Sequence, residues 1–467
     1  MKNILRDISF LTSEINKFKF SMIRKAMIDG ERYYLGLHDI LKRTRTAIGE
    51  NGELNEVHNI PNNRIVDNQY RKMVNQKVDY LLAKPLTIEC ENKTYLKLLK
   101  SIFNKRFQRI IKNIAEDSLN CGIGFLFVYY NELGELSFKR FKPFEVIPHW
   151  LDSEHTELEY LIRFFNVEVF KNGFYETVEK VEVYSDLGID HYEFVGGNLK
   201  LVEPYHTNYL IRIKDGVEHF YNWYKIPIIP FKYNHKEIPL IKMVKTLQDG
   251  LNLLESNFQN QMEEDSRNTI LIIKNYDGEN LGEFRRNLAT YGAVKVRTDS
   301  STNGGVDSLH VEVNSENYRT ILEIFKKAII ENSMGYDAKD DRLSGTPNQM
   351  NILSMYSDID LDTNSLETEF QASFEELLWF INVHFNIKGL GNFENEVVEF
   401  IFNRDILISE SEAIENCVKS MGILSNETIL AQHPWISDVE LELVRLEAQK
   451  AKELDSYGFE KEEPEDE

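Results

Sequence analysis

The stretch that decides the fold is Lys339-Asp340-Asp341-Arg342-Leu343-Ser344-Gly345-Thr346-Pro347-Asn348-Gln349, because it joins a charged loop to the start of a long helix. Thr346 supplies an N-cap oxygen, Pro347 suits the first helical position, and Gln349 can complete a capping box. Apolar residues then recur in steps of three and four as far as Phe385. We therefore predict a single helix over residues 347–385, about 55–60 Å long at about 1.5 Å per residue.

The composition is that of an ordinary soluble protein that acts in a reducing compartment. Of the 467 residues, 42% are hydrophobic and only three are cysteines, none of which forms a CxxC pair. Arg6, Asp7 and Glu14 interrupt the N-terminal region, so we expect no signal peptide. The apolar runs are too short to cross a bilayer, and no membrane contact is predicted.

Charge is distributed unevenly along the chain. The first 110 residues hold 21 Lys and Arg against 12 Asp and Glu, whereas the whole chain has a net charge of −22. This asymmetry can reflect solvated surfaces that merely differ in sign, or an assembly in which the N-terminal region meets acidic partners. The acidic majority argues against tight, sequence-reading nucleic-acid binding, which needs cations to displace counterions.

The first half of the chain is typical of an α+β domain. We predict helices over residues 10–48 and 64–82, strands within residues 123–147, and short β-type runs from 160 to 233.

The second half is predicted to be mainly helical. A helix is expected at 239–264, strands at 270–274, 294–297 and 309–313 around a short helix at 280–291, and a further helix at 315–334. After the long helix, a strand at 397–403 precedes a helical segment from about 410 to 454. Residues 460–467 contain six acidic residues and are expected to be disordered.

The helix at 239–264 carries a heptad seam. Its apolar residues alternate between spacings of four and three. Such a seam fits either an amphipathic helix packed on its own domain or packing against identical helices of neighbouring subunits. The seam residues, which we take as candidates for oligomerisation, are Leu240, Val244, Leu247, Leu251, Leu254 and Phe258.

The sequence contains no convincing active site. Phosphate-loop, dinucleotide-binding, nucleophile-elbow and zinc-protease motifs are absent, and the histidines lack metal-ligand spacing. Residues 358–369 imitate a calcium loop, but Thr363 replaces the glycine of the sharp turn, which favours a solvated acidic helix face. Asp337, Asp340 and Asp341 could hold Mg²⁺, although a plain charged loop is favoured. We predict no enzyme activity, no catalytic residue, no metal site and no cofactor.

Several short segments, taken in order, resemble the portal proteins of tailed double-stranded-DNA bacteriophages, in the type found in long-tailed phages of Gram-positive hosts. Each segment alone is weak, but the ordered set is specific and covers nearly the whole chain. The segments are Tyr33-Tyr34-Leu35-Gly36-Leu37-His38-Asp39-Ile40-Leu41, Asn63-Arg64-Ile65-Val66-Asp67, Tyr80-Leu81-Leu82-Ala83-Lys84-Pro85, Cys121-Gly122-Ile123-Gly124-Phe125, Pro143-Phe144-Glu145-Val146-Ile147-Pro148, Ile226-Pro227-Ile228-Ile229-Pro230-Phe231 with Asn252, Ser256 and Asn260, Asp341 to Thr346, and Leu424-Ser425-Asn426-Glu427-Thr428. One departure follows the loop, where Asn348-Gln349-Met350-Asn351 replaces the family's small residues.

The resemblance implies a portal fold built from named parts. These parts would be a wing at 1–238, stem helices at 239–264 and 315–334, a clip at 265–314, a tunnel loop at 335–346, a long helix and wing return at 347–404, a crown at 405–459 and an acidic tail at 460–467. The tunnel-loop residues expected to face DNA are Asp337, Lys339, Asp340, Asp341, Arg342, Ser344, Gly345 and Thr346.

The resemblance also implies a function and a set of partners. The chain would form a ring, expected to be a dodecamer, at one capsid vertex, through which double-stranded DNA enters during packaging and leaves during ejection. Expected partners are the terminase large subunit, a head–tail adaptor, scaffold and major capsid proteins, first in the host cytoplasm and then in the virion. Two alternatives remain at this point: another head or baseplate structural protein, or a DNA-acting packaging enzyme.

Overall fold

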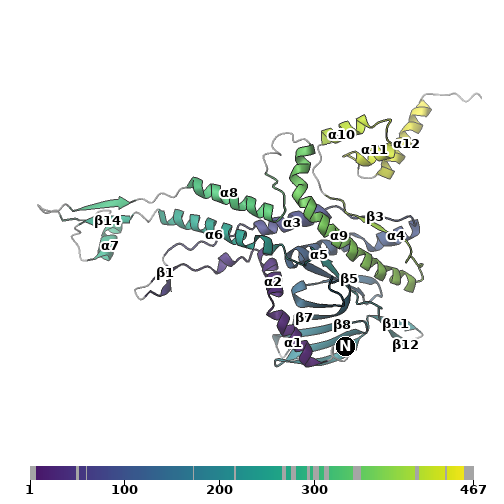
Figure 1. Cartoon of the computed structure of the whole chain (residues 1–467), viewed down its shortest axis with the longest axis horizontal. Coiled ribbons are helices and arrows are strands. Elements are labelled where there is room, and N and C mark those ends of the chain that lie inside the picture. The colour runs from purple at the N-terminus through teal and green to yellow at the C-terminus, as the bar shows by residue number, and fades with distance from the viewer. Residues whose placement is uncertain are drawn as a thin grey trace, which may run out of the picture.

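The computed structural model describes residues 7–48, 52–58, 60–171, 173–214, 217–265, 270–274, 280–291, 295–297, 304–309, 315–339, 349–404, 410–436 and 439–456. Within these residues the chain is a mixed α+β protein with twelve α-helices and six small antiparallel sheets. Figure 1 shows a body of sheets and helices from which the pair α6 and α8 projects.

The N-terminal segment forms two helices, α1 (Ile8–Lys19) and α2 (Met22–Tyr34). The helical region expected over residues 10–48 is therefore two helices, and its end was placed too late, since residues 46–48 form a strand. Ser21 starts α2 by accepting a hydrogen bond from the Arg24 N–H, and Gly36 ends the helical region with a φ of 82° that L-residues rarely adopt. A short hairpin follows, formed by β1 (Thr46–Ile48) and β2 (Leu54–Glu56).

Three helices build the middle of the body: α3 (Gln69–Leu82), α4 (Lys93–Ile102) and α5 (Lys105–Cys121). The sequence placed the start of α3 too early, at Arg64. Asn92 and Asn104 cap α4 and α5 with their side-chain oxygens, which was a readable signal for two helices that were not predicted.

Three sheets form the rest of the N-terminal half. One has the order β13-β4-β5, the largest is a five-stranded meander in the order β10-β9-β8-β7-β6, and β11 and β12 form a two-stranded sheet. The predicted short runs are in fact long strands, with 14 residues in β7 and 12 in β8. The strand bounds are β4 (Ile123–Tyr130), β5 (Leu136–Phe141), β6 (Val146–Trp150), β7 (Leu158–Lys171), β8 (Phe174–Ser185), β9 (Gly188–Val195), β10 (Asn198–Thr207), β11 (Leu210–Lys214), β12 (Val217–Tyr221) and β13 (Ile228–Lys232).

The projecting pair consists of α6 (Ile241–Asp265) and α8 (Ser315–Asn332), close to the predicted bounds. Gly250 permits their close approach, because a Cβ at this position would lie 2.6 Å from the Phe325 ring. At the far end of the pair lie α7 (Leu281–Tyr291) and the two-stranded sheet β14–β15 (Figure 1).

The strand positions in this distal unit test two further predictions. β14 (Ile270–Lys274) matches its prediction, whereas β15 spans Gly305–Leu309 and so begins earlier than the predicted strand at 309–313. Residues 310–313 of that predicted strand lie outside the described part of the chain.

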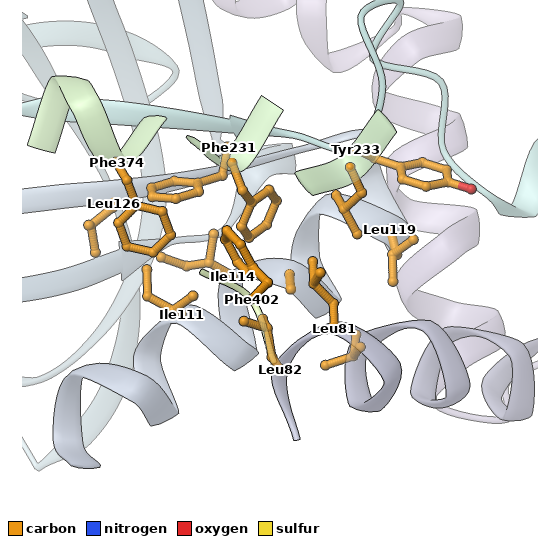
Figure 2. Close-up of a cluster of buried hydrophobic side chains, with 14 of the residues drawn as sticks. Leu81, Leu82, Ile111, Ile114, Leu119, Leu126, Phe231, Tyr233, Phe374 and Phe402 are labelled. Carbon is orange, nitrogen blue, oxygen red and sulfur yellow. The ribbon is translucent and has the colours of Figure 1, made fainter. Parts of the chain in front are cut away.

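The predicted long helix is confirmed as α9 (Gln349–Ile387), with 39 residues. It crosses the body, and its apolar face enters the main core. Figure 2 shows Phe374 packed beside Phe231 of β13 and above Ile111 and Ile114 of α5. The α9 side chains of this core are Leu366, Phe370, Phe374, Leu377, Phe380, Ile381 and Phe385.

The C-terminal region returns to the body and then leaves it. β16 (Glu399–Ile401) pairs with β3 (Thr87–Glu89), and the helices α10 (Glu410–Lys419), α11 (Asn426–Gln432) and α12 (Val439–Ser456) follow. The predicted helical segment is therefore three helices, the second of which starts at an N-cap made by Ser425. The acidic residues 460–467 lie outside the described part of the chain.

A ladder of polar side chains on α6 explains why α3 starts late. Gln248, Asn252, Ser256 and Asn260 recur every four residues and are almost fully buried. They bind the extended segment 63–67 that leads into α3, which therefore cannot be helical. Backbone N–H groups donate along the ladder from Asn63 to Asn260 Oδ1 (2.7 Å), from Ile65 to Ser256 Oγ (2.9 Å), from Asp67 to Asn252 Oδ1 (3.1 Å) and from Tyr70 to Gln248 Oε1 (3.0 Å).

The ladder predicts the effect of Asn252→Ala. The change would leave the Asp67 N–H without its acceptor and remove the contact of Asn252 with His38, so we expect a loss of about 2–3 kcal/mol in the free energy of unfolding. Thermal and denaturant unfolding would measure it. The control Gln259→Ala removes an exposed amide on the same helix that binds only Glu263, and it should change stability by less than about 0.5 kcal/mol. Equal effects of the two changes would contradict a structural role for the ladder.

Candidate functional site: the base of the loop between α8 and α9

The loop between α8 and α9 begins with a fixed helix end. The Gly335 N–H donates to the Ile330 carbonyl and the Met334 N–H to the Glu331 carbonyl, which together form a Schellman motif. Met334 takes the left-handed conformation of this motif, with a φ of 52°. Gly335 is buried, and a Cβ there would lie 2.7 Å from the Met73 sulfur, so the chain leaves α8 in close contact with α3.

The next residue, Tyr336, is bound to α3 through its backbone. The Gln76 amide accepts from the Tyr336 N–H (3.1 Å) and donates to the Tyr336 carbonyl (2.8 Å), as a neighbouring strand would. The Tyr336 ring contacts Tyr356 of α9 at 4.6 Å between centroids, and Tyr356 stacks on Tyr80 of α3 at 5.5 Å. Three tyrosines from three segments therefore join the loop entrance to the first turns of α9.

A buried ion pair lies beside these rings. The Lys77 side chain of α3 is fully buried and donates to Asp362 of α9 at 2.6 Å and to the Met334 carbonyl at 3.1 Å. Tyr233 donates to the same carboxylate at 3.0 Å. Burial lowers the pKa of Lys77, while the Asp362 carboxylate acts in the opposite sense; burial and the same carboxylate raise the pKa of Tyr233. This cluster connects α3, the end of α8, β13 and α9.

A second polar cluster holds the opposite side of α9. Arg404, just after β16, donates to Asp360 at 2.7 Å and to Glu367 at 2.8 Å, and Tyr80 donates to Asp360 at 2.5 Å. The interpretation of residues 358–369 as a solvated acidic face is therefore wrong for Asp360 and Asp362, which are partly buried and paired. Because the whole segment is helical, the calcium-loop alternative is also excluded.

These anchoring residues were missed from the sequence, although one signal was present. Lys77 lies among the apolar residues that α3 buries, where an unpaired lysine would be costly. Its partner lies 285 residues further along the chain, and no sequence spacing identifies it.

The described residues include only part of the predicted loop. Asp337 is partly buried and accepts a hydrogen bond from the Lys339 N–H at 3.0 Å, while Lys339 is exposed. The other residues predicted to face DNA lie outside the described part of the chain. They are Asp340, Asp341, Arg342, Ser344, Gly345 and Thr346.

The heptad seam divides into two groups. Leu240, Val244 and Leu251 are fully buried in the core of a single subunit, which supports packing of this part of the seam against its own domain. The others remain partly exposed: Leu247 lies at the edge of the core, Leu254 lies further along α6, and Phe258 contacts Tyr318 of α8 at 4.8 Å between centroids. Contact of these three with a neighbouring subunit stays a prediction.

Of the described helices, none is both long and apolar enough to cross a membrane. Nor does the described part of the chain gather three or more His, Cys, Asp or Glu side chains in an arrangement that could hold a metal ion. The contacts at the base of the loop join the start of the loop to α3 and α9.

Comparisons with known proteins show the family of this chain. The model of the family described as phage portal protein, SPP1 Gp6-like, matches residues 19–455, and the chain belongs to this family. It is 27% identical to the portal protein of Bacillus phage SPP1 over 435 residues, which cover 92% of this chain and 84% of that protein. It is 28% identical to the portal protein of Clostridium phage phiCD119 over 451 residues, which cover 93% and 96% respectively.

Family membership sets the class of function. The chain is a non-enzymatic structural component of a phage virion that takes part in DNA packaging, and the family implies an oligomeric ring at the capsid vertex through which DNA passes. The expectation of a portal protein is confirmed, and the alternatives of a baseplate protein or a packaging enzyme are set aside.

The buried ion pair of Lys77 and Asp362 predicts how the free energy of unfolding changes when the lysine is replaced. Lys77→Met would leave the Asp362 carboxylate buried without its cation and should lower the free energy of unfolding by about 3–5 kcal/mol. The double change Lys77→Met with Asp362→Leu removes both charges and should recover much of that loss. Denaturant unfolding of the single and double variants measures the coupling. Lys327→Met, at a lysine that is 76% exposed and loosely paired with Glu331, is the control and should cost less than about 1 kcal/mol. Additive effects at residues 77 and 362 would contradict the pairing.

Proposed function

We propose that this chain forms a dodecameric portal ring in which the loop at 335–346 projects into the tunnel and contacts passing DNA. The observation that supports this proposal is the double anchoring of the loop's entrance, through Gln76 and Lys77, to α3 and α9. An anchored base lets the intervening segment move while the 39-residue helix stays in place. Lys339 and Arg342 would meet phosphates transiently and without sequence preference, since flexible cations offer charge but no base-reading geometry.

We further propose the division into wing, stem, clip, tunnel loop and crown given by the family resemblance. In this arrangement α6 and α8 are the stem, and the unit of α7, β14 and β15 is the clip. That unit lies at the far end of the projecting pair (Figure 1), a position suited to contact with other proteins. Terminase would dock during packaging and the head–tail adaptor afterwards, while scaffold and major capsid proteins would surround the ring in the virion.

Replacing both loop cations tests the contact with DNA. Lys339→Ala with Arg342→Ala should leave rings of normal size, because other residues make the anchoring contacts described above, and should lower the amount of DNA packaged or retained. In vitro packaging and light scattering measure the two outcomes. The matched control is Arg319→Ala with Lys327→Ala, which removes the same charge from two exposed cations of α8. Normal packaging by the loop variant, with rings of normal size, would refute a contact through these two side chains.

A further inference from the structure

The helix pair α4–α5 presents a basic surface in an otherwise acidic protein. Residues 92–115 contain seven Lys and Arg and no Asp or Glu, although the whole chain has a net charge of −22. Lys112 pairs with Asp79 at 2.5 Å. The other six are exposed, and within the described part of the chain none of them forms an ion pair. They are Lys93, Lys97, Lys100, Lys105, Arg106 and Arg109.

The geometry of the two helices gathers these cations on their outer faces. Lys93, Lys97 and Lys100 are spaced by four and three residues, so they share the face of α4 opposite the buried Tyr95 and Leu99. Lys105 and Arg109 are four residues apart on α5, whose other face buries Phe107 and Ile111. On such a face the Cβ atoms of neighbouring residues lie about 5–6 Å apart, so each helix presents a row of positive charge.

The surface lacks the features of a protein-binding site. Exposed large hydrophobic side chains occur in many parts of the described chain, but α4 and α5 contribute none of them. Stable protein interfaces need an apolar or aromatic centre that excludes water, with charges at the rim. A surface made of flexible, unpaired cations alone matches the backbone of a polyanion instead.

We propose that the α4–α5 surface binds the phosphate backbone of double-stranded DNA, without sequence preference, at a place distinct from the tunnel loop. Tyr95 of α4 donates a hydrogen bond to Asn382 of α9 at 2.7 Å. That position lies about 50 Å along α9 from its first residue, Gln349, at about 1.5 Å per residue. Figure 1 also places α4 beside the end of α9 that is remote from the loop. The surface therefore contacts DNA independently of the loop cations.

Binding of closed circular DNA reports contacts outside the tunnel, because a closed duplex cannot thread an assembled ring. The variant carries Lys93→Gln, Lys97→Gln, Lys100→Gln and Lys105→Gln. The control carries Arg319→Gln, Lys327→Gln, Lys419→Gln and Arg445→Gln, which removes the same charge from exposed residues that pair with carboxylates on their own helices. Binding of a relaxed plasmid to the assembled full-length protein is measured at several salt concentrations.

We expect the α4–α5 variant to bind the plasmid at least tenfold more weakly at low salt, with rings of unchanged size. The slope of log affinity against log salt should fall by about 0.9 for each lost phosphate contact. The control and the Lys339→Ala, Arg342→Ala variant should keep wild-type binding to the plasmid. Four results would overturn the proposal: an equal loss in the control, a loss in the loop variant, disassembly of the ring by the α4–α5 changes, or polyglutamate competing as well as DNA.

Discussion

The fold depends on the hydrogen bonds that side chains of α6 accept from the backbone of residues 63–67, the segment before α3. An extended segment inside a protein must find partners for its N–H groups, and here a helix provides them with its side chains instead of a neighbouring strand. Ser256 and Asn252 accept from Ile65 and Asp67, which fixes both the path of the segment and the direction of α3. α3 in turn carries Gln76 and Lys77. The position of the loop entrance therefore depends in part on these hydrogen bonds, while α9 is held mainly by the apolar face that it packs into the core.

This chain of contacts gives α3 a mechanical role between α6 and α9. The polar ladder fixes its N-terminal end, and the Lys77–Asp362 pair fixes its middle to α9. A buried charge pair tolerates little displacement, because separating its members leaves two desolvated charges. Movement of the projecting pair α6–α8 would thus reach α9 through α3.

The sequence predicted the elements whose signal is local and missed those decided by distant partners. The long helix was predictable from its apolar steps. The four-residue spacing of Gln248, Asn252, Ser256 and Asn260 was visible too, but its meaning required the segment 63–67, which lies almost two hundred residues earlier. That segment has helical periodicity when read alone, so the start of α3 was placed too early. Tertiary hydrogen bonding overrode the local preference.

At the candidate site, too, the sequence alone does not identify the distant partners of the charged residues. Asp360 and Asp362 look solvated in the sequence because aspartates usually are, and only their partners Arg404 and Lys77 show that they are paired. The α4–α5 cations present the opposite case. Their basic character was visible only as an excess over the first 110 residues. It became a defined surface once the two helices placed the cations on their outer faces.

The loop cations and the α4–α5 cations differ in the number of acidic residues close to them in the sequence, and from this difference we infer different roles for them. Lys339 and Arg342 stand beside Asp337, Asp340 and Asp341 in the sequence, so under the proposed function their attraction for DNA would be weak and brief. The cations of α4 and α5 have no acidic residue between positions 92 and 115 of the sequence, and within the described part of the chain only Lys112 among them forms an ion pair. In the proposed ring, a tunnel loop that releases DNA at every step would benefit from weak attraction, whereas the proposed surface remote from the loop would hold DNA without slowing its passage.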